Sequence, residues 1–459
     1  MIKERGEDLR AGGNGCSTDG CIALLKCPGA LIMASGVSHT ESGYAWLLVI
    51  VASMLMGMGG GALISISTFL KPISTDFGWL RGQTSFAYMA GTIAMGIGGI
   101  VMGHLSDRFG TRPVVMLGLA SLGCSLLLLG TQSALWQFYL YYCMLGGIGA
   151  STLDAPLLAN VGRWFERNKG LALGVATAGR ALGQGFVPFG AGLLIAALGW
   201  RSAYFTIGAI CLAVMLPLAL LVRNPPDRLQ TKAASPDSSG AQNDKAFPIP
   251  PKLAVTWLAC ASIFCCTCMG TAMVHAVAIA QDAGLAAERA AGVILLIYVS
   301  GFFGRIAFGK LSDHSGGVPA YWLASLGQTV LIFWFTQMHS LAAFYAQAVI
   351  FGFFMSGVMT GLIICVRELT PTSIRGVSTG VVFMTAWIGM GIGGYQGGFF
   401  FDWSGTYAIS YANAVVAGTI NLIIVGSLFF YIRGRGHRPP TQGLPDLLAG
   451  RTDSRSKLA

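Results

Sequence analysis

Charged side chains are scarce in this chain of 459 residues. They make up 10% of it, whereas hydrophobic residues make up 54% and the mean hydropathy is +0.65. A soluble domain needs about a quarter of its residues charged to cover its surface. The shortage therefore excludes an ordinary soluble domain and indicates that the outer surface of the protein meets lipid.

The sequence also lacks the motifs of catalysis and nucleotide binding. It contains no Gly-Lys-Ser/Thr phosphate-binding loop, no metal-ligand set and no nucleophile–base pair. We therefore expect no enzyme activity, no cofactor, no bound metal and no ATP-driven transport by this chain alone.

Cysteine is present, with eleven residues, but the spacing does not suggest a disulfide framework. Eight of the cysteines lie inside apolar stretches, where a small polarisable side chain packs well. The cluster Cys265-Cys266-Thr267-Cys268 could form a soft-metal site, but no set of His or Asp partners surrounds it. Packing is the favoured interpretation.

Twelve apolar stretches dominate the rest of the sequence, each near the roughly 20 residues that span a bilayer as a helix. They cover residues 44–70, 84–103, 113–131, 135–160, 170–198, 203–222, 253–281, 291–309, 318–337, 341–366, 376–401 and 407–432. A transmembrane barrel would show short alternating strands instead. The predicted fold is an all-α membrane protein with 12 transmembrane helices.

Two loops between these stretches are repeated at one constant offset. The segment 103–112 (Gly-His-Leu-Ser-Asp-Arg-Phe-Gly-Thr-Arg) returns in weaker form at 309–316, and 169–174 returns at 375–380, each 206 residues later. A constant offset at two separate loops indicates a duplicated unit, and hence two six-helix halves related by pseudo-symmetry. Parallel repeats of this kind build secondary transporters whose binding site lies between the halves.

The predicted organisation has an N-terminal half at residues 43–222 and a C-terminal half at 253–432. A linker at 223–252 joins them and is rich in Pro, Ser, Asp and Lys, a composition that stays solvated and flexible. Tails at 1–42 and 433–459 complete the chain, and the first of them lacks the layout of a cleavable signal peptide.

The net charge of +10 reflects membrane topology rather than nucleic-acid binding. With both termini inside, the inner loops carry thirteen basic residues, whereas the outer loops carry four: Lys71, Arg81, Arg201 and Arg289. The positive-inside rule then predicts a multi-pass protein of the cell inner (plasma) membrane with the linker and both tails in the cytoplasm. We expect the lipid bilayer, and no nucleic acid, as its partner.

The first repeated loop resembles the signature of the major facilitator superfamily, whose fold has two six-helix halves. Gly103 and Gly110 are expected to permit a tight turn, and Asp107 and Arg108 to pair with helix ends or neighbouring charges. The resemblance implies that the loop latches the halves together in one state of a transport cycle; the alternative is a plain solvated connector. The predicted latch residues are Gly103, Asp107, Arg108, Gly110, Arg112 and Asp313.

Two further segments resemble signatures of monocarboxylate transporters. Residues 41–46 (Glu-Ser-Gly-Tyr-Ala-Trp) resemble the motif before helix 1, and 164–183 resembles the second signature at the start of helix 5. Small residues at four-residue steps in the second segment predict close packing of helix 5 against a neighbour. Because the resemblance runs from about Glu41 to Arg433, we hypothesise that Met33 is the true start. The compact loops resemble the bacterial branch, which also includes oxalate/formate-type exchangers.

Two charges that this family associates with proton-coupled lactate transport are missing. The helix 1 lysine aligns with Ile64, and a carboxylate of helix 8 aligns with Gly301, whereas the arginine of helix 8 is matched by Arg305. Neither a lactate-like substrate nor proton coupling through those groups therefore follows from the resemblance.

Four ionisable side chains lie well inside the apolar stretches: Asp154, Arg180, His275 and Arg305. A charge at membrane depth costs about 2.5–3.5 kcal/mol or more, so each needs a partner or a function. Arg305 presents a guanidinium fork that matches a carboxylate, and Tyr298 lies seven residues earlier on the same helix face. The alternative is that Arg305 snorkels to the inner interface, about 6 Å of helix rise away at Gly309.

Arg180 and Asp154 are predicted to lie at similar depths on neighbouring helices. Arg180 is about 16 Å of rise from Lys169, and Asp154 is about 13 Å from Arg163. One interpretation is a buried ion pair that is purely structural. The other is that a substrate carboxylate competes for Arg180 and thereby favours protonation of Asp154, which makes Asp154 a candidate proton-coupling group.

His275 is the one histidine inside an apolar stretch. It could relay a proton near neutral pH, or it could simply hydrogen-bond a backbone carbonyl. We predict a position in the central cavity, as a candidate for both substrate contact and proton coupling. Trp387 and Tyr395 are predicted to serve packing.

These features predict a secondary active transporter of small organic anions, either mono- or dicarboxylates, that works by alternating access with proton coupling or exchange. Arg305 and Arg180 would hold the anion between the halves. Two free guanidiniums would favour a dianion, whereas neutralisation of Arg180 by Asp154 would favour a monoanion. The alternatives are an exporter of amphipathic compounds and a carboxylate receptor that does not transport.

Overall fold

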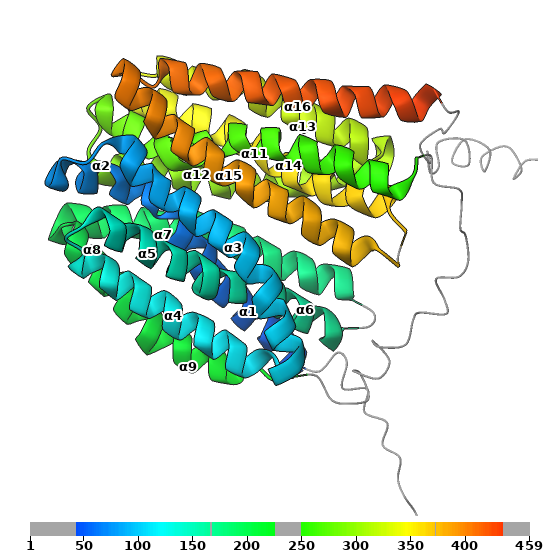
Figure 1. Cartoon of the computed structure of the whole chain (residues 1–459), viewed down its shortest axis with the longest axis horizontal. Coiled ribbons are helices and arrows are strands. Elements are labelled where there is room, and N and C mark those ends of the chain that lie inside the picture. The colour runs from blue at the N-terminus through cyan, green and yellow to red at the C-terminus, as the bar shows by residue number, and fades with distance from the viewer. Residues whose placement is uncertain (1–42, 166–167, 225–248, 372, 435–459) are drawn as a thin grey trace, which may run out of the picture. The chain divides into compact units, whose positions relative to one another are not determined.

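The computed structural model describes residues 43–165, 168–224, 249–371 and 373–434. The predicted tails, most of the predicted linker and the hypothetical start at Met33 lie outside these residues. Within them every regular element is helical (Figure 1). The absence of strands from the described residues agrees with the predicted all-α class.

The helices follow the predicted apolar stretches closely. The first half contains α1 (Gly43–Ile64), α2 (Ile66–Phe77), α3 (Arg81–Phe109), α4 (Thr111–Thr131), α5 (Leu135–Met144), η2 (Leu145–Ala150), α6 (Ala155–Trp164), α7 (Lys169–Leu198), α8 (Trp200–Ile210), η3 (Cys211–Met215), α9 (Leu216–Leu218) and η4 (Ala219–Leu221). The second half contains α11 (Pro251–Asp282), α12 (Ala287–Ser315), α13 (Gly317–Ile332), η6 (Phe333–Gln337), α14 (Leu341–Leu369), α15 (Arg375–Ser404) and α16 (Ala408–Gly434). Eleven helical segments of the described chain are long and apolar enough to cross a membrane.

The fourth predicted span is broken, which corrects the prediction of one continuous helix over 135–160. Helix α5 passes into the π-helical turn η2, and Asp154 then adopts φ −100° and ψ −84° before α6 begins. Pro156 occupies the first turn of α6, where its missing N–H and fixed φ are tolerated. Asp154 therefore lies at a helix break rather than inside a helix.

The constant offset of the sequence repeat reappears in the backbone. Six glycines of the described residues have φ between +66° and +90°, and they form three pairs 206 residues apart: Gly78 with Gly284, Gly110 with Gly316, and Gly199 with Gly405. A left-handed φ favours glycine because other residues place a Cβ too close to the following carbonyl. Each of these three turns therefore occurs once in each half of the chain.

These turns also define the two ends of the bundle. We call the end with the turns at Gly78 and Gly284 the Gly78 end, and the end with the turns at Gly110 and Gly316 the Gly110 end. The predicted turn at Gly110 is confirmed by its φ of +87°. The turn predicted at Gly103 is wrong, because α3 continues unbroken to Phe109.

Helix α7 packs closely through small residues, as the sequence predicts, and the structure shows that its neighbour is α1. A Cβ on Gly183 would come within 2.2 Å of the Gly57 Cα, and a Cβ on Gly179 within 2.3 Å of the Ser53 Cβ. Such backbone approach maximises packing between helices in lipid, where apolar burial from water does not drive association.

The main contacts between the two halves run along two helix pairs, α3 with α15 and α7 with α12, and a smaller contact joins α2 to α11. Helices α3 and α15 run side by side in Figure 1. Large apolar side chains on other faces are exposed, among them Trp403 at 74%, Val377 at 73% and Phe430 at 71%. An apolar exterior of this kind suits lipid contact rather than water.

Candidate substrate site

Arg180 of α7 and Asp154 at the helix break form the predicted ion pair. The Nη2 atom of Arg180 lies 3.4 Å from Oδ2 of Asp154, and the side chains are 18% and 22% exposed. The Arg180 guanidinium also lies 5.3 Å from the ring centroid of Trp387 on α15, in the other half. Irregular backbone at membrane depth is tolerated where it lies inside protein or lines a cavity, which suits the break at Asp154.

Arg305 of α12 reaches the opposite half through a backbone contact. Its Nη1 donates to the carbonyl oxygen of Thr177 on α7 at 3.2 Å, whereas its buried Nε has no hydrogen-bond partner. Helix α12 continues past Gly309 to Ser315, so Arg305 lies about 15 Å of rise from the helix end rather than the predicted 6 Å. This greater distance argues against simple snorkelling.

Two tyrosines lie near these guanidiniums. Tyr298 is 4% exposed, packs on Gly185 of α7 and interacts electrostatically with both Arg180 and Arg305. Tyr298 therefore lies near Arg305, as expected for two residues predicted to share one helix face; its contact with substrate stays a prediction.

Tyr88 of α3 was missed by the sequence reasoning. It is fully buried, its hydroxyl has no hydrogen-bond partner, and it interacts electrostatically with Tyr298 and Arg180. A buried hydroxyl without a partner is costly, so a ligand that accepts its hydrogen bond gains affinity. The sequence does not distinguish Tyr88 from a tyrosine that only packs. What marks Tyr88 is that its buried hydroxyl lacks a hydrogen-bond partner, and only the structure shows this.

His275 is not brought together with the two arginines. It is fully buried in α11, where Nε2 contacts the Gly394 carbonyl oxygen at 2.7 Å and Nδ1 contacts the Tyr407 hydroxyl at 3.1 Å. The carbonyl contact that the sequence left open as an alternative is therefore present. The neighbours of His275 lie at the Gly78 end, with Arg81 and Asp282.

Uncharged, closely packed residues stand at the positions of the two charges that the family has and this chain lacks. Ile64 is 1% exposed in α1. A Cβ on Gly301 would come within 2.2 Å of the Ser356 Oγ, so a carboxylate does not fit there without rearrangement. The charges of this site instead come from Asp154, Arg180 and Arg305.

The predicted latch residues at the Gly110 end do not join the halves in this structure. Asp107 accepts from Arg163 at 2.9 Å, and both belong to the first half. Arg108, Arg112 and Asp313 are exposed. Within the described residues, no ion pair crosses between the halves at this end.

The described residues contain no group of three or more His, Cys, Asp or Glu side chains that could hold a metal ion. The eight cysteines in this part of the chain are unpaired, and those at 265, 266 and 268 are buried.

Comparison with known proteins agrees with this architecture. Residues 45–335 match the Major Facilitator Superfamily profile. The chain is 28% identical to monocarboxylate transporter 13 of Bos taurus, over 93% of this chain and 98% of that protein. It is 28% identical to monocarboxylate transporter 11 of Homo sapiens, over 85% and 83%. The Bacillus subtilis (strain 168) MFS-type transporter YcxA is 26% identical, over 78% and 89%.

Solved structures share the fold at low sequence identity. An inward-facing, occupied bacterial homologue of the human lysosomal transporter Spinster superposes with a TM-score of 0.67 at 14% identity, over 87% of this chain and all of that one. A D-xylose–proton symporter gives a TM-score of 0.66 at 17% identity, over 83% and 97%.

The chain belongs to the Major Facilitator Superfamily. It is a multi-pass membrane transporter with the fold of that family, similar to the monocarboxylate transporters. The predictions of fold class and family are thereby confirmed, and the family and the relatives are transporters rather than enzymes.

Proposed function

We propose that the protein carries small monocarboxylates across the membrane by alternating access of its two halves. The observation that carries this proposal is the Asp154–Arg180 contact of 3.4 Å. One carboxylate offsets one guanidinium, and no acidic side chain of the described residues is paired with Arg305. The site therefore holds one uncompensated positive charge, which matches one substrate carboxylate. The names of the relatives, monocarboxylate transporters 13 and 11, support the same substrate class.

The donors for the substrate carboxylate come from both halves. Arg305 has a buried Nε without a partner, and Tyr88 has a buried hydroxyl without a partner. Charge-assisted hydrogen bonds from a guanidinium to a carboxylate are short and strong, and a second donor fixes the orientation of the anion. We assign Arg305 as the primary anion ligand, with Tyr298 against it, and Tyr88 as an orienting donor.

Arg180 and Asp154 give the site a means of coupling to protons. A substrate carboxylate that draws Arg180 away from Asp154 leaves that carboxylate without its counter-ion, which favours its protonation. Asp154 is therefore the proposed proton-coupling group, and exchange of one anion for another is the alternative mode. By the positive-inside rule we place the protein in the cell inner membrane, with the Gly110 end in the cytoplasm.

The test is uptake of radiolabelled monocarboxylates by proteoliposomes that contain the Arg305→Ala variant. We expect loss of saturable uptake with normal insertion, because the primary ligand is removed. The matched control is Arg201→Ala, since Arg201 pairs with Asp76 away from the site, 2.7 Å apart. Uptake like that of the wild type by Arg305→Ala contradicts the proposed role. Retained transport of an amphipathic compound alone favours the exporter, and binding without any transport favours the receptor.

A further inference from the structure

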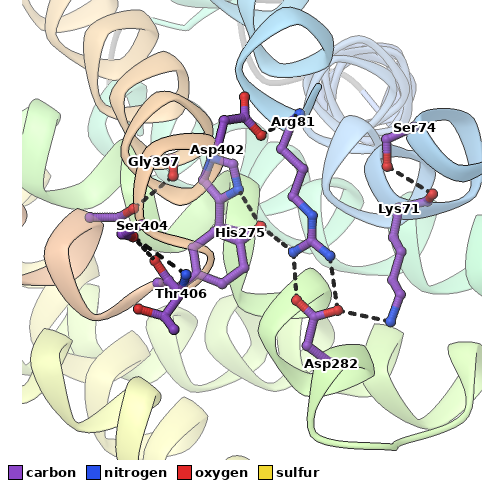
Figure 2. Close-up of polar contacts among 11 residues, drawn as sticks. Lys71, Ser74, Arg81, His275, Asp282, Gly397, Asp402, Ser404 and Thr406 are labelled. Atoms are coloured by element: carbon purple, nitrogen blue, oxygen red, sulfur yellow. Dashed lines mark hydrogen bonds and ion pairs between the residues drawn. The ribbon is translucent and has the colours of Figure 1, made fainter. Parts of the chain in front are cut away.

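A cluster of charges joins the two halves at the Gly78 end. Asp282 of α11 accepts from the Arg81 guanidinium through both carboxylate oxygens, at 2.9 and 2.5 Å, and its Oδ1 lies 2.8 Å from Nζ of Lys71. Figure 2 shows the Asp282 carboxylate between these two side chains. Arg81 belongs to α3 and Lys71 to α2, so both cations come from the first half and the anion from the second. Bidentate guanidinium–carboxylate pairs have the strongest and most directional geometry of this type.

A second carboxylate of the second half closes on the backbone of the first. Asp402 of α15 accepts from the backbone N–H of Arg81 at 2.9 Å (Figure 2). It also accepts from the backbone N–H of Gly82 at 2.6 Å. These are free N–H groups of the first turn of α3, where a negative charge is favoured by the helix dipole. A Cβ on Gly82 would come within 2.9 Å of the Asp402 Oδ2 and 3.2 Å of the Phe399 backbone, so glycine permits this approach.

His275 is linked to Arg81 through the hydroxyl group of Tyr407. Arg81 Nη1 donates to the Tyr407 hydroxyl oxygen at 2.9 Å, and the same hydroxyl lies 3.1 Å from His275 Nδ1. Because the Gly394 carbonyl can only accept, we assign the ring hydrogen to Nε2. Nδ1 then accepts from the Tyr407 hydroxyl. The hydrogen bonds thus run in one direction from Arg81 to Gly394, with a neutral imidazole.

The halves are packed more tightly at the Gly78 end than toward the Gly110 end. Along the α3–α15 contact, a Cβ on Gly398 would lie 2.5 Å from the Arg81 carbonyl oxygen, and one on Gly391 would lie 2.6 Å from the Thr92 Oγ1. Further along the same pair, the nearest atom to a Cβ on Gly96 is 3.7 Å away. The structure thus combines ion pairs and close packing between the halves at the Gly78 end with looser packing toward the Gly110 end.

We propose that the cluster of Lys71, Arg81, His275, Asp282, Asp402 and Tyr407, here called the Asp282 cluster, is the gate that closes the Gly78 end. Asp282 and Asp402 hold the halves together, and His275 is a positioning residue that orients Arg81 through Tyr407. An open hollow of about 470 Å³ between the halves is lined by Lys71 and Gln281, beside Asp282, where water can hydrate the charges as they separate. In the predicted orientation this end faces away from the cytoplasm. The proposal needs alternating access of the two halves and holds for any cargo.

The test is hydrogen–deuterium exchange of the purified full-length protein in lipid nanodiscs, read by mass spectrometry without substrate. We compare Asp282→Asn and Asp402→Asn with Asp76→Asn. Loss of the negative charge of Asp282 or of Asp402 should speed exchange of the backbone amides at 79–86 about tenfold, because hydrogen bonds to charged groups are stronger than those between neutral groups. Asp76→Asn should exchange like the wild type there, since its Arg201 partner belongs to the same half.

The same measurement separates a gate from general destabilisation. A gate predicts slower exchange at the Gly110 end when the Gly78 end opens, whereas partial unfolding speeds exchange at both ends and overturns the proposal. Unchanged exchange at 79–86 in both Asp282→Asn and Asp402→Asn also overturns the proposal. For His275, Gln keeps a donor and an acceptor on the side chain and should preserve slow exchange better than Phe, which has neither; equal effects refute the positioning role. Because no substrate is present, the result is independent of the monocarboxylate proposal.

Discussion

Replacing Asp154 by Asn tests the charge balance on which the proposed substrate class depends. The variant keeps the size of the side chain but removes the one negative charge beside Arg180, 3.4 Å away. The net charge of the site then rises by one unit. We expect the preference to move from monocarboxylates toward dicarboxylates, because the second substrate carboxylate gains a free guanidinium.

The size of this shift follows from the geometry of the site. Both side chains are about one-fifth exposed, so the charges are partly screened by water. An extra unit charge at about 6 Å, with an effective dielectric constant between 20 and 80, is worth about 0.7 to 2.8 kcal/mol. The affinity for a dicarboxylate relative to a monocarboxylate should therefore rise roughly threefold to a hundredfold.

The assay is competition: unlabelled mono- and dicarboxylates of matched chain length displace a labelled monocarboxylate from proteoliposomes that contain each protein. Asp76→Asn is the matched control, because it breaks an ion pair with Arg201 away from the two site arginines. Thermal unfolding in the absence of ligand shows whether Asp154→Asn still folds. A folded Asp154→Asn protein with an unchanged preference would refute the charge-balance reasoning.

Two further predictions concern the hydroxyl of Tyr88 and the contact between α1 and α7. Tyr88→Phe should weaken anion binding by about 0.5–1.5 kcal/mol, or roughly twofold to tenfold in Kd, without lowering the Tm, because its hydroxyl has no protein partner to lose; a fall in Tm with unchanged Kd would show a structural role instead. Gly183→Ala should destabilise the protein by about 1–3 kcal/mol or more, because its Cβ would lie 2.2 Å from the Gly57 Cα. Gly174→Ala is the control, since no atom lies within 4 Å of its Cβ, and equal Tm values for the two variants would contradict this account.

Much of the fold could be predicted from composition and from the lengths of the apolar stretches. The helices in lipid must satisfy their own backbone hydrogen bonds, so an apolar run of sufficient length becomes a helix whatever its neighbours do. The break at Asp154 could not be placed in the same way, although Pro156 gave a signal for it. Apolar residues continue across the break, and a hydropathy pattern does not register a change of backbone angle.

The candidate site could be predicted only in part. Asp154 and Arg180 were paired correctly because both lie at similar depth on adjacent segments, and an unpaired charge at that depth is costly. The predicted central-cavity position of His275 did not anticipate its contacts with Gly394 and Tyr407, because depth along α11 does not reveal which partner the ring meets. Tyr88 was missed since an unpartnered hydroxyl is visible only in three dimensions.

The sequence by itself determined the number of apolar spans, the repeat offset of 206 residues and the identity of the few charged residues at membrane depth. These follow from local chemistry, since chain length, hydropathy and turn-forming glycines act over short distances along the chain. Only the tertiary structure decided how the charges are divided between tasks. Asp154 offsets Arg180, Asp282 binds Arg81 across the halves, and Arg305 is left without an acidic partner among the described residues. Pairing of this kind depends on distances between helices that are far apart in the sequence, and Coulomb attraction selects partners by those distances.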